Sequence, residues 1–514
     1  MSELARFFRQ HAGELGEQAL EHLMLTLSAL ALAVFVGLPL GLWLARRKTA
    51  SRVVLGIAAV IQTIPSLALL GFLIPFTGIG PVPAIIALFA YALLPIVTNT
   101  VTGVRGVDPA VTEAAVGMGM TNLDVLRKVE LPLALPVIFA GVRTATAVNV
   151  GVATLAALVG AGGLGVYIFR GISLADPTMI LAGAIPAAAL ALTLDAGLGA
   201  IERNIGSSFR PVVVVVAALV ALVVGGRSLL TFSSPSLRLA MPGEFLARVD
   251  GYAGLAGTYE LHTRVLEMDH GLMYQALARG DVEAVVGYST DGEIASNGFR
   301  LLADDRHYFP PYYVAPVVRR ATLERHPELA AALDRLRNRL DDGSMSALNA
   351  RVEHGHESAG DVARSFLVGV GFSVVPHRVS PHADVVIASK TFAEQYLLAE
   401  MLGDLVEAYT PLTVELKLGL GGTKICFEAL RKGEVDVYPE YTGTGLFAIL
   451  GAPAARARDA SAVYDYVRRE FDARFGLEWL APLGFQNTYA VIVSPRIAAT
   501  KSIHTVSEFA LLGR

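Results

Sequence analysis

The chain has 514 residues, of which 53% are hydrophobic and 17% charged, and its mean hydropathy is +0.52. This composition excludes an ordinary soluble protein, so part of the chain is expected to lie in a membrane. The formal net charge is -4 without any basic tract, which argues against nucleic acid as a partner because phosphates demand clustered Lys and Arg. The single cysteine, Cys426, excludes an internal disulfide and a cysteine-based metal site.

Six apolar stretches predict six membrane-spanning helices. Between Arg52 and Arg105 the chain has no charged residue and no histidine, a gap that fits two spans of about 20 residues each, joined by a turn at residues 77–83. The other four stretches are residues 23–45, 144–169 with a helix start near Leu135, 177–194 and 211–226. We therefore expect an N-terminal segment at residues 1–20 and a transmembrane domain at residues 21–232.

Basic residues gather in alternate short loops of this domain. They follow the first, third and fifth predicted spans, at Arg46, Arg47, Lys48 and Arg52, at Arg105, Arg127 and Lys128, and at Arg203 and Arg210. Loops rich in Lys and Arg stay on the cytoplasmic side of a membrane, so these three loops are predicted to be cytoplasmic. The N-terminus and the polar residues 233–514 are then expected on the external face.

The longest predicted cytoplasmic loop has the pattern EAAVGMGMTNLDVLRKVELP, at residues 113–132. We expect a short helix that ends at a glycine, then a second helix that reaches the membrane surface; from physics alone, an interfacial amphipathic helix pair is an equal alternative. The spacing resembles the EAA loop of ABC importer permeases, through Glu113, Ala114, Ala115, Gly119, Leu131 and Pro132. That resemblance implies that the loop docks on a separate ATP-binding subunit.

Two glycine-rich runs resemble nucleotide-binding motifs but lack the features that such motifs need. GAGGLG at residues 160–165 follows an apolar span and opens no βαβ unit. GLGGTK at residues 419–424 lacks the Gly-Lys-Ser/Thr order that binds phosphate and Mg²⁺. With no nucleophile beside a base and no metal-ligand set, the chain is not expected to be an enzyme or to need a cofactor or metal, and the ATPase must be a partner.

Beyond residue 232 the composition becomes that of a soluble α/β domain. Strand-like runs such as ADVVIAS, TVELKL and YAVIVS alternate with helical runs such as FAEQYLLAEMLGDLVEAY. This alternation predicts two lobes with parallel strands and a ligand in the cleft. The predicted fold class is an all-α membrane domain of six helices, followed by an α/β two-lobed domain of the periplasmic-binding-protein type.

Seven stretches of this domain resemble the substrate-binding proteins of glycine betaine, choline and carnitine importers. They are SKTFAEQ (389–395), LGGTKICFEALRKGEVDVYPEYTGTG (420–445), LGFQNTYA (483–490), RVDGYAGL (248–255), MDHGLMYQAL (268–277), GYSTDGEI (287–294) and DDRHYFPPYYVAP (304–316). In that family SKTFAEQ-like residues open the domain, whereas here residues 236–372 precede residues 384–514. This order implies a circular permutation with the old termini joined through residues 374–384; a truncated second copy is the alternative.

The resemblance also implies an aromatic cage for a quaternary ammonium group. A trimethylammonium carries a charge but no N–H, so ring faces hold it by cation-π contact. The family's cage corresponds here to Tyr288, Tyr312, Tyr441 and Tyr489. For a ligand carboxylate the corresponding residue is Arg248, assisted by Thr444, because arginine grips a carboxylate with two parallel bonds. Gln395 is expected either to contact the ligand's other end or to stabilise the start of its own helix.

Together these features predict the fused permease and binding subunit of an ABC importer for quaternary ammonium compounds in a bacterial inner membrane. One permease supplies half of a transport pathway, so a homodimer with two ATPase subunits is expected. Two alternatives remain: the ligand is another betaine, such as carnitine or ergothioneine, or the chain is a membrane-bound solute receptor or sensor.

Overall fold

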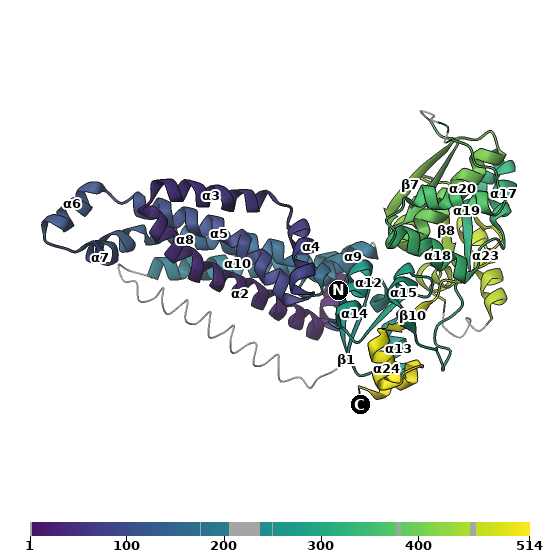
Figure 1. The fold of residues 1–514 in the computed structure, drawn as a ribbon, viewed down its shortest axis with the longest axis horizontal. Coiled ribbons are helices and arrows are strands. Elements are labelled where there is room, and N and C mark those ends of the chain that lie inside the picture. The colour runs from purple at the N-terminus through teal and green to yellow at the C-terminus, as the bar shows by residue number, and fades with distance from the viewer. Residues whose placement is uncertain are drawn as a thin grey trace. The chain divides into compact units, whose positions relative to one another are not determined.

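The computed structural model describes residues 3–174, 176–204, 237–248, 250–376, 378, 382–452 and 459–513. The chain divides into two compact units, which Figure 1 shows as a helical part and a part that also contains strands. The first unit contains Met1–Gly171 and continues from Pro177, and the second consists of Ser236–Arg514 with the short segment Ile172–Asp176.

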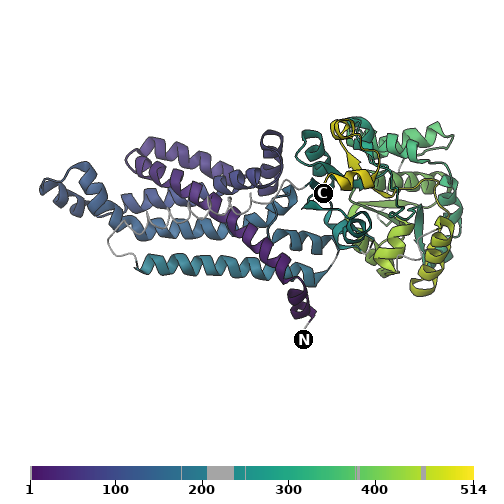
Figure 2. The same cartoon turned by 90° about the horizontal axis from the view of Figure 1, so that it is seen from below.

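The described part of the first unit is helical. Its elements are α1 (Glu3–Gln10), α2 (Ala12–Ala45), α3 (Lys48–Thr63), α4 (Ser66–Thr77), α5 (Pro81–Arg105), α6 (Pro109–Gly117), α7 (Asn122–Val125), the π-helix η1 (Leu126–Glu130), α8 (Leu131–Ala153), the 3₁₀-helix η2 (Thr154–Val159), α9 (Gly165–Ser173) and α10 (Pro177–Asn204). The long helices pack side by side, α2 on α5, α5 on α8, and α8 on α10 (Figure 2).

Among the described residues, four helices are long and apolar enough to cross a membrane: Ala12–Ala45, Pro81–Arg105, Asn122–Val159 and Pro177–Arg203. The pair α3 and α4 makes a fifth span if the two helices are counted together, although they meet at 98°. The expected sixth span, residues 211–226, lies outside the described residues. The first span also starts earlier than predicted, because α2 begins at Ala12.

The bend between α3 and α4 has a local cause. Pro65 has no N–H, and it holds Ile64 in an extended conformation (φ -68°, ψ 127°), so the helix cannot continue through this pair. The hydroxyl of Tyr91 in α5 donates a hydrogen bond to the Ile64 carbonyl, and Gln62 Nε2 donates to the Tyr91 carbonyl at 2.9 Å. The backbone at the break is thus partnered from the neighbouring helix, as an apolar environment requires.

The second unit alternates strands and helices. Its first segment contains β1 (Leu237–Met241), α12 (Gly243–Ala247), α13 (Tyr252–Tyr259), β2 (Thr263–Glu267), α14 (His270–Arg279), β3 (Ala284–Tyr288), α15 (Gly292–Asn297), β4 (Arg300–Leu301), β5 (Val314–Arg319), α16 (Arg320–Arg325), α17 (Glu328–Leu333), the 3₁₀-helix η3 (Asp334–Leu336), α18 (Asp342–Glu353) and α19 (Ala359–Gly369). Its second segment contains β6 (Val385–Lys390), α20 (Ala393–Tyr409), β7 (Val414–Gly421), α21 (Thr423–Lys432), β8 (Val437–Tyr441), α22 (Thr442–Thr444), the π-helix η4 (Gly445–Ile449), α23 (Ala460–Phe475), β9 (Leu477–Trp479), β10 (Tyr489–Val493), α24 (Pro495–Lys501) and α25 (Val506–Leu511).

These strands form two five-stranded sheets, one in each lobe. The strand order is β2-β1-β3-β10-β4 in the first sheet and β7-β6-β8-β5-β9 in the second. Neighbours β2, β1 and β3 are parallel, as are β7, β6 and β8, whereas β10 and β5 run antiparallel to their neighbours. Each segment therefore contributes one strand to the sheet built by the other, so the two segments complete a single two-lobed fold.

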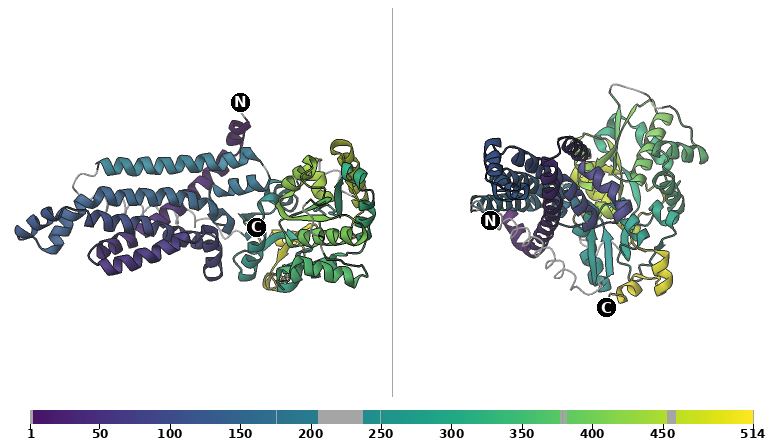
Figure 3. Two further views of the ribbon diagram at one scale, coloured as in Figure 1. Left: turned by 90° about the horizontal axis from the view of Figure 1, so that it is seen from above. Right: turned by 60° about the vertical axis from the view of Figure 1, so that its left-hand side comes forward.

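The outer ends of the two segments lie close to one another. A β-carbon added to Gly513 would lie 3.4 Å from Leu237 Cδ1, so the end of the chain runs beside the start of β1 (Figures 1 and 3). At the other joint, Arg378 donates from its backbone to Glu407 Oε1 at 3.1 Å and from its guanidinium to the carbonyls of Glu407, Thr410 and Leu412 at 2.8–3.2 Å. These carbonyls lie at and just after the end of α20, where a helix leaves acceptors free.

The one cysteine belongs to the core. Cys426 in α21 is fully buried, and its Sγ lies 3.6 Å from the Ser389 carbonyl. Burial raises the pKa of this thiol to about 12, so it stays protonated and packs as a small apolar side chain.

Candidate functional site

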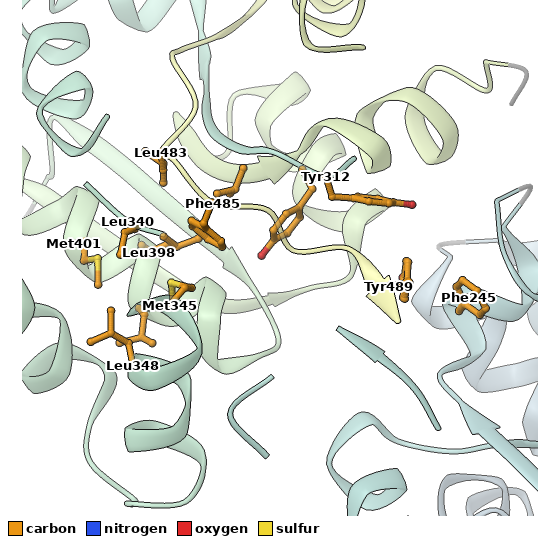
Figure 4. Close-up of a cluster of buried hydrophobic side chains, with 14 of the residues drawn as sticks. Phe245, Tyr312, Leu340, Met345, Leu348, Leu398, Met401, Leu483, Phe485 and Tyr489 are labelled. Atoms are coloured by element: carbon orange, nitrogen blue, oxygen red, sulfur yellow. The ribbon is translucent and has the colours of Figure 1, made fainter. Parts of the chain in front are cut away.

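Three of the four predicted cage tyrosines meet at one end of the first sheet. Tyr288 ends β3 and pairs across the ladder with Tyr489, which begins β10, and their ring centroids are 4.9 Å apart. Tyr312, from the segment that crosses between the two lobes, meets the Tyr489 ring edge-on at 5.9 Å. Figure 4 shows Tyr312 and Tyr489 next to each other, with Phe245 beyond Tyr489. The Phe245 and Tyr489 ring centroids are 4.6 Å apart.

The fourth tyrosine reaches this group through a residue that sequence reasoning missed. Tyr441 ends β8 in the second sheet, and the Phe392 ring lies 6.3 Å from it and 5.4 Å from the Tyr288 ring, stacked on both. An unbroken series of rings therefore joins the two lobes. Phe392 belongs to the SKTFAEQ motif. Its position in a motif of the predicted binding site, together with its aromatic ring, could have identified it from the sequence.

Arg248 lies among these rings, 5.5 Å from the Tyr489 centroid and 5.8 Å from the Tyr312 centroid. Its Nε and Nη2 donate to the two carboxylate oxygens of Asp250 at 2.9 and 2.8 Å, and Nη2 also donates to the Tyr312 hydroxyl at 3.0 Å. Its remaining nitrogen, Nη1, faces Thr444 Oγ1 in the other lobe at 3.5 Å. The structure thus brings Arg248 and Thr444 together, with one edge of the guanidinium already occupied by Asp250.

A second contact bridges the lobes beside this arginine. Thr423 Oγ1 at the start of α21 donates to Glu244 Oε1 in α12 at 3.0 Å, and the Glu244 carboxylate lies 3.8 Å from Arg248. Polar groups of both lobes therefore meet at the edge of the tyrosine group, where a small ligand between the lobes would be enclosed.

Gln395 is fully buried and is fixed by three hydrogen bonds. Its Oε1 accepts from the Lys390 backbone N–H at 3.2 Å, and its Nε2 donates to the Pro439 carbonyl at 3.0 Å and to the Tyr441 hydroxyl at 3.2 Å. It therefore holds Tyr441 and the turn before α20. Lys390 was not predicted; its Nζ lies 2.6 Å from Glu440 Oε1 and 5.2 Å from the Tyr441 ring centroid.

An acidic and histidine group lies behind Tyr288. The His270 ring lies 5.1 Å from the Tyr288 ring, and its Nε2 is 3.0 Å from Asp291 Oδ2, which also accepts from the Tyr288 backbone N–H at 2.8 Å. Burial and the charge of Asp291 raise the pKa of Glu353 to about 8, from an ordinary value of 4.5. The folded chain therefore keeps a proton on Glu353 at pH values where the unfolded chain loses it.

This proton makes stability depend on pH. Because the folded state binds more protons, the free energy of unfolding of this domain falls as pH rises from about 4.5 to about 8. Glu353→Gln is expected to flatten that fall and to stabilise the domain at pH 8.5 by about 1–2 kcal/mol, less than the full shift would supply because the side chain is partly exposed. Denaturant unfolding followed by Trp479 fluorescence in a Trp43→Phe background measures this, and Glu324→Gln at an exposed position is the control. An unchanged pH profile in Glu353→Gln would contradict the prediction.

The predicted coupling loop forms two short helices. Asp108 caps the start of helix α6 (Pro109–Gly117), since its side chain accepts from the Ala110 N–H at 2.8 Å, and the helix is followed by a glycine turn in which Gly119 has φ +85°. The Met120 N–H donates to the Ala115 carbonyl at 3.2 Å and the Gly119 N–H to the Val116 carbonyl at 2.9 Å, which is a Schellman ending.

The second helix of the loop continues into the membrane helix. It runs from Asn122 through η1 directly into α8, so Leu131 and Pro132 lie inside a continuous 38-residue helix, whereas the sequence predicted that the membrane helix starts near Leu135. The π-turn η1 just before Pro132 accommodates a residue that has no N–H to donate. Glu130 in this turn forms an ion pair with Arg46, which ties the loop to the end of α2.

The loop presents an apolar surface to solvent. Glu113, Ala114 and Gly119 are exposed, whereas Ala115 is buried. The apolar side chains of Val116, Met118 and Leu123 are 56%, 73% and 55% exposed. Exposed apolar side chains that gather on one surface are typical of sites that bind another protein.

Comparisons with known protein families match both the membrane domain and the binding domain of this chain. The profile of the family described as the substrate binding domain of ABC-type glycine betaine transport systems matches residues 228–368 and 383–511. The profile of the binding-protein-dependent transport system inner membrane component matches residues 37–238.

Relatives with curated descriptions match the membrane half. The choline transport system permease protein OpuBB of Bacillus subtilis is 47% identical over 205 residues, which cover 40% of this chain and 94% of that protein. The glycine betaine/carnitine/choline transport system permease protein OpuCB of the same organism is 45% identical over 205 residues with the same coverage. The osmoprotectant import permease protein OsmW of Salmonella typhimurium is 46% identical over 194 residues, which cover 37% of this chain and 90% of that protein. The chain therefore belongs to the family of ABC-type glycine betaine transport systems, and it unites their substrate-binding domain with their inner membrane component.

Proposed function

We propose that this chain binds and imports a quaternary ammonium compound, choline or glycine betaine, with energy from a separate ATPase. The observation that supports the ligand class is one series of rings from both lobes: Tyr288, Tyr312 and Tyr489 meet in one lobe, and Phe392 connects Tyr288 to Tyr441 in the other. Arg248 lies against Tyr312 and Tyr489, and its Nη1 faces Thr444. Ring faces attract a cation that offers no N–H, and the apolar wall that they form suits three methyl groups. In this proposal the rings hold the trimethylammonium, while Arg248 Nη1 and Thr444 Oγ1 receive the ligand's polar end.

The transport cycle follows from the arrangement of the two halves in the chain. We infer that six spans cross the membrane, with the N-terminus and residues 233–514 on the external face, as the distribution of Lys and Arg supports. The membrane half supplies one side of a pathway, so two copies of the chain would assemble with two ATPase subunits. The apolar tip at Val116 and Met118 would dock on the ATPase, and the continuous helix from Asn122 to Val159 would carry its movement to the membrane.

We also infer that the binding domain is a circular permutation of the family's chain order. Both sheets use strands from both segments, and Gly513 lies against Leu237, where the family's order would continue the chain. A permutation leaves the site intact because the site depends on contacts and not on chain order. A truncated second copy, the alternative, predicts that residues 236–514 cannot fold alone as a compact monomer.

Calorimetric titration of residues 233–514 with choline, glycine betaine, carnitine and ergothioneine tests the proposal. We expect a folded monomer that binds choline or glycine betaine with micromolar or lower Kd, and the ranking of the four identifies the preferred ligand. Tightest binding of carnitine or ergothioneine would move the assignment to a larger betaine. A folded domain that binds none of the four would contradict the ligand class, and a domain that cannot fold alone would contradict the permutation.

A further inference from the structure

A buried carboxylate, Glu394, stands at the centre of the site without a role in the proposal above. It lies in the first turn of α20, directly after Phe392 and Ala393, and its side chain is 1% exposed. A buried ionised carboxylate is costly unless donors or an opposite charge stabilise it. The hydrogen-bond partners of Glu394 therefore indicate whether its carboxylate is ionised.

Four donors surround the two oxygens. Oε1 accepts from the Tyr441 hydroxyl at 2.6 Å and from Asn487 Nδ2 at 2.8 Å. Oε2 accepts from Thr290 Oγ1 at 2.6 Å and from Asn349 Nδ2 at 3.1 Å. Both oxygens are thus occupied by groups that donate, which is the environment of an ionised carboxylate.

The Tyr441 hydroxyl donates its proton to the hydrogen bond with Glu394. Gln395 Nε2 donates to the Tyr441 oxygen at 3.2 Å, so the phenol accepts from Gln395 and donates to Glu394. Burial raises the pKa of Glu394, and its four hydrogen bonds act in the opposite direction and favour the charged form. A phenol that donates to a carboxylate gains electron density in its ring, which strengthens the attraction of the ring for a cation.

The donors come from the segments that carry the cage. Tyr441 is itself a cage residue, Thr290 follows Tyr288 by two residues, and Asn487 precedes Tyr489 by two. Thr290 lies after a strand of the first sheet and Tyr441 in a strand of the second, so one carboxylate connects both lobes at the site.

Glu394 has no compensating cation in the part of the chain that the structure describes. The nearby ammonium of Lys390 is paired with Glu440 at 2.6 Å, and the guanidinium of Arg248 with Asp250 at 2.8 Å. Within the described ranges, no Lys, Arg or His nitrogen lies within 4.0 Å of the Glu394 carboxylate. Its charge is therefore available to a cation that enters the cage.

We propose that Glu394 is a positioning residue that supplies the counter-charge of the cage: it orients Tyr441 and makes the site select a permanent cation over an uncharged molecule of the same shape. The inference rests on the proposed quaternary ammonium function. It adds the requirement that the ligand be positively charged. Ring faces and apolar walls alone do not impose this requirement, because they also accept a neutral tert-butyl group.

The test compares choline with its uncharged carbon isostere, 3,3-dimethylbutan-1-ol. Binding of both is measured with the full chain in lipid nanodiscs, for the wild type, Glu394→Gln and the control Glu407→Gln. The control removes another fully buried carboxylate from the same helix, at its far end. We expect Glu394→Gln to weaken choline binding by about tenfold or more while it changes the affinity for the alcohol by less than about twofold. The control should leave both affinities unchanged.

The outcomes separate this inference from the proposed function. Wild-type protein that binds no quaternary ammonium compound contradicts the proposed function, whereas wild-type binding of choline with an unchanged choline-to-alcohol ratio in Glu394→Gln contradicts the role of Glu394. If Glu394→Gln loses both ligands equally, Glu394→Asp decides. That variant keeps the charge, so a preserved choline-to-alcohol ratio at lower affinity supports the counter-charge, and a ratio that collapses refutes it.

Discussion

Replacement of Tyr288 and Tyr441 together by alanine is expected to weaken choline binding on the order of 100-fold, because each desolvated ring face contributes about 0.5–2 kcal/mol to a bound cation. The two residues come from different sheets, and the Phe392 ring stacks on both. The double variant therefore removes one ring from each lobe. Isothermal titration of the double variant against the wild type measures the effect. Retention of wild-type affinity by the folded double variant would remove these tyrosines from the site.

Two further variants separate the chemistry of the rings from their volume. Tyr288→Leu with Tyr441→Leu keeps apolar side chains in place but removes the ring quadrupole, so choline binding should remain weak even when the fold is stable. Tyr438→Ala is the matched control, since Tyr438 is a buried tyrosine of the same strand but belongs to a different core cluster. It is expected to lower the free energy of unfolding while the folded fraction binds choline normally.

Charge at the tip of the coupling loop is expected to stop transport without affecting ligand binding. Val116→Glu with Met118→Glu places two carboxylates on the apolar surface proposed to dock on the ATPase, where the buried charges would find no partner. Uptake of labelled choline into proteoliposomes that contain the complete transporter should fall on the order of 100-fold. Choline affinity of the same variant should match that of the wild type, because these residues belong to the membrane unit and the tyrosines to the other.

The conservative change Met118→Leu keeps an apolar side chain of similar volume and should retain transport. Co-purification with the ATPase gives an independent readout, since the double glutamate variant is expected to lose its partner and Met118→Leu to keep it. Normal transport by the double glutamate variant would show that this surface is not the docking site. It would also revive the interpretation of the loop as an interfacial helix pair.

Most of the membrane half was predictable from the residues, because the signal there is local. Long uncharged stretches predicted membrane helices in the described part of the chain, and a glycine six residues after Glu113 predicted the turn at Gly119. The span predicted at residues 144–169 was wrong at both ends, because the helix runs from Asn122 to Val159. Local signals failed where a helix deviates from a simple span. Pro65 breaks one span into a bent pair of helices. Pro132 does not interrupt its helix, because the π-turn before it accommodates a residue without an N–H. Proline identity alone does not distinguish these outcomes.

In the binding domain, the sequence by itself determined the family, and it predicted four tyrosines that the structure places in one series of rings, since short motifs keep their residues in whatever order the segments follow. Only the tertiary structure decided that Phe392 joins two cage rings, that Asp250 occupies one edge of Arg248, and that Glu394 gathers donors from both lobes. Two of these contacts link residues about one hundred positions apart, and neither propensity nor periodicity records which distant side chains will meet. The physical reason is that a motif specifies its own backbone and side chains, whereas contacts between distant residues arise only when packing brings their separate segments together.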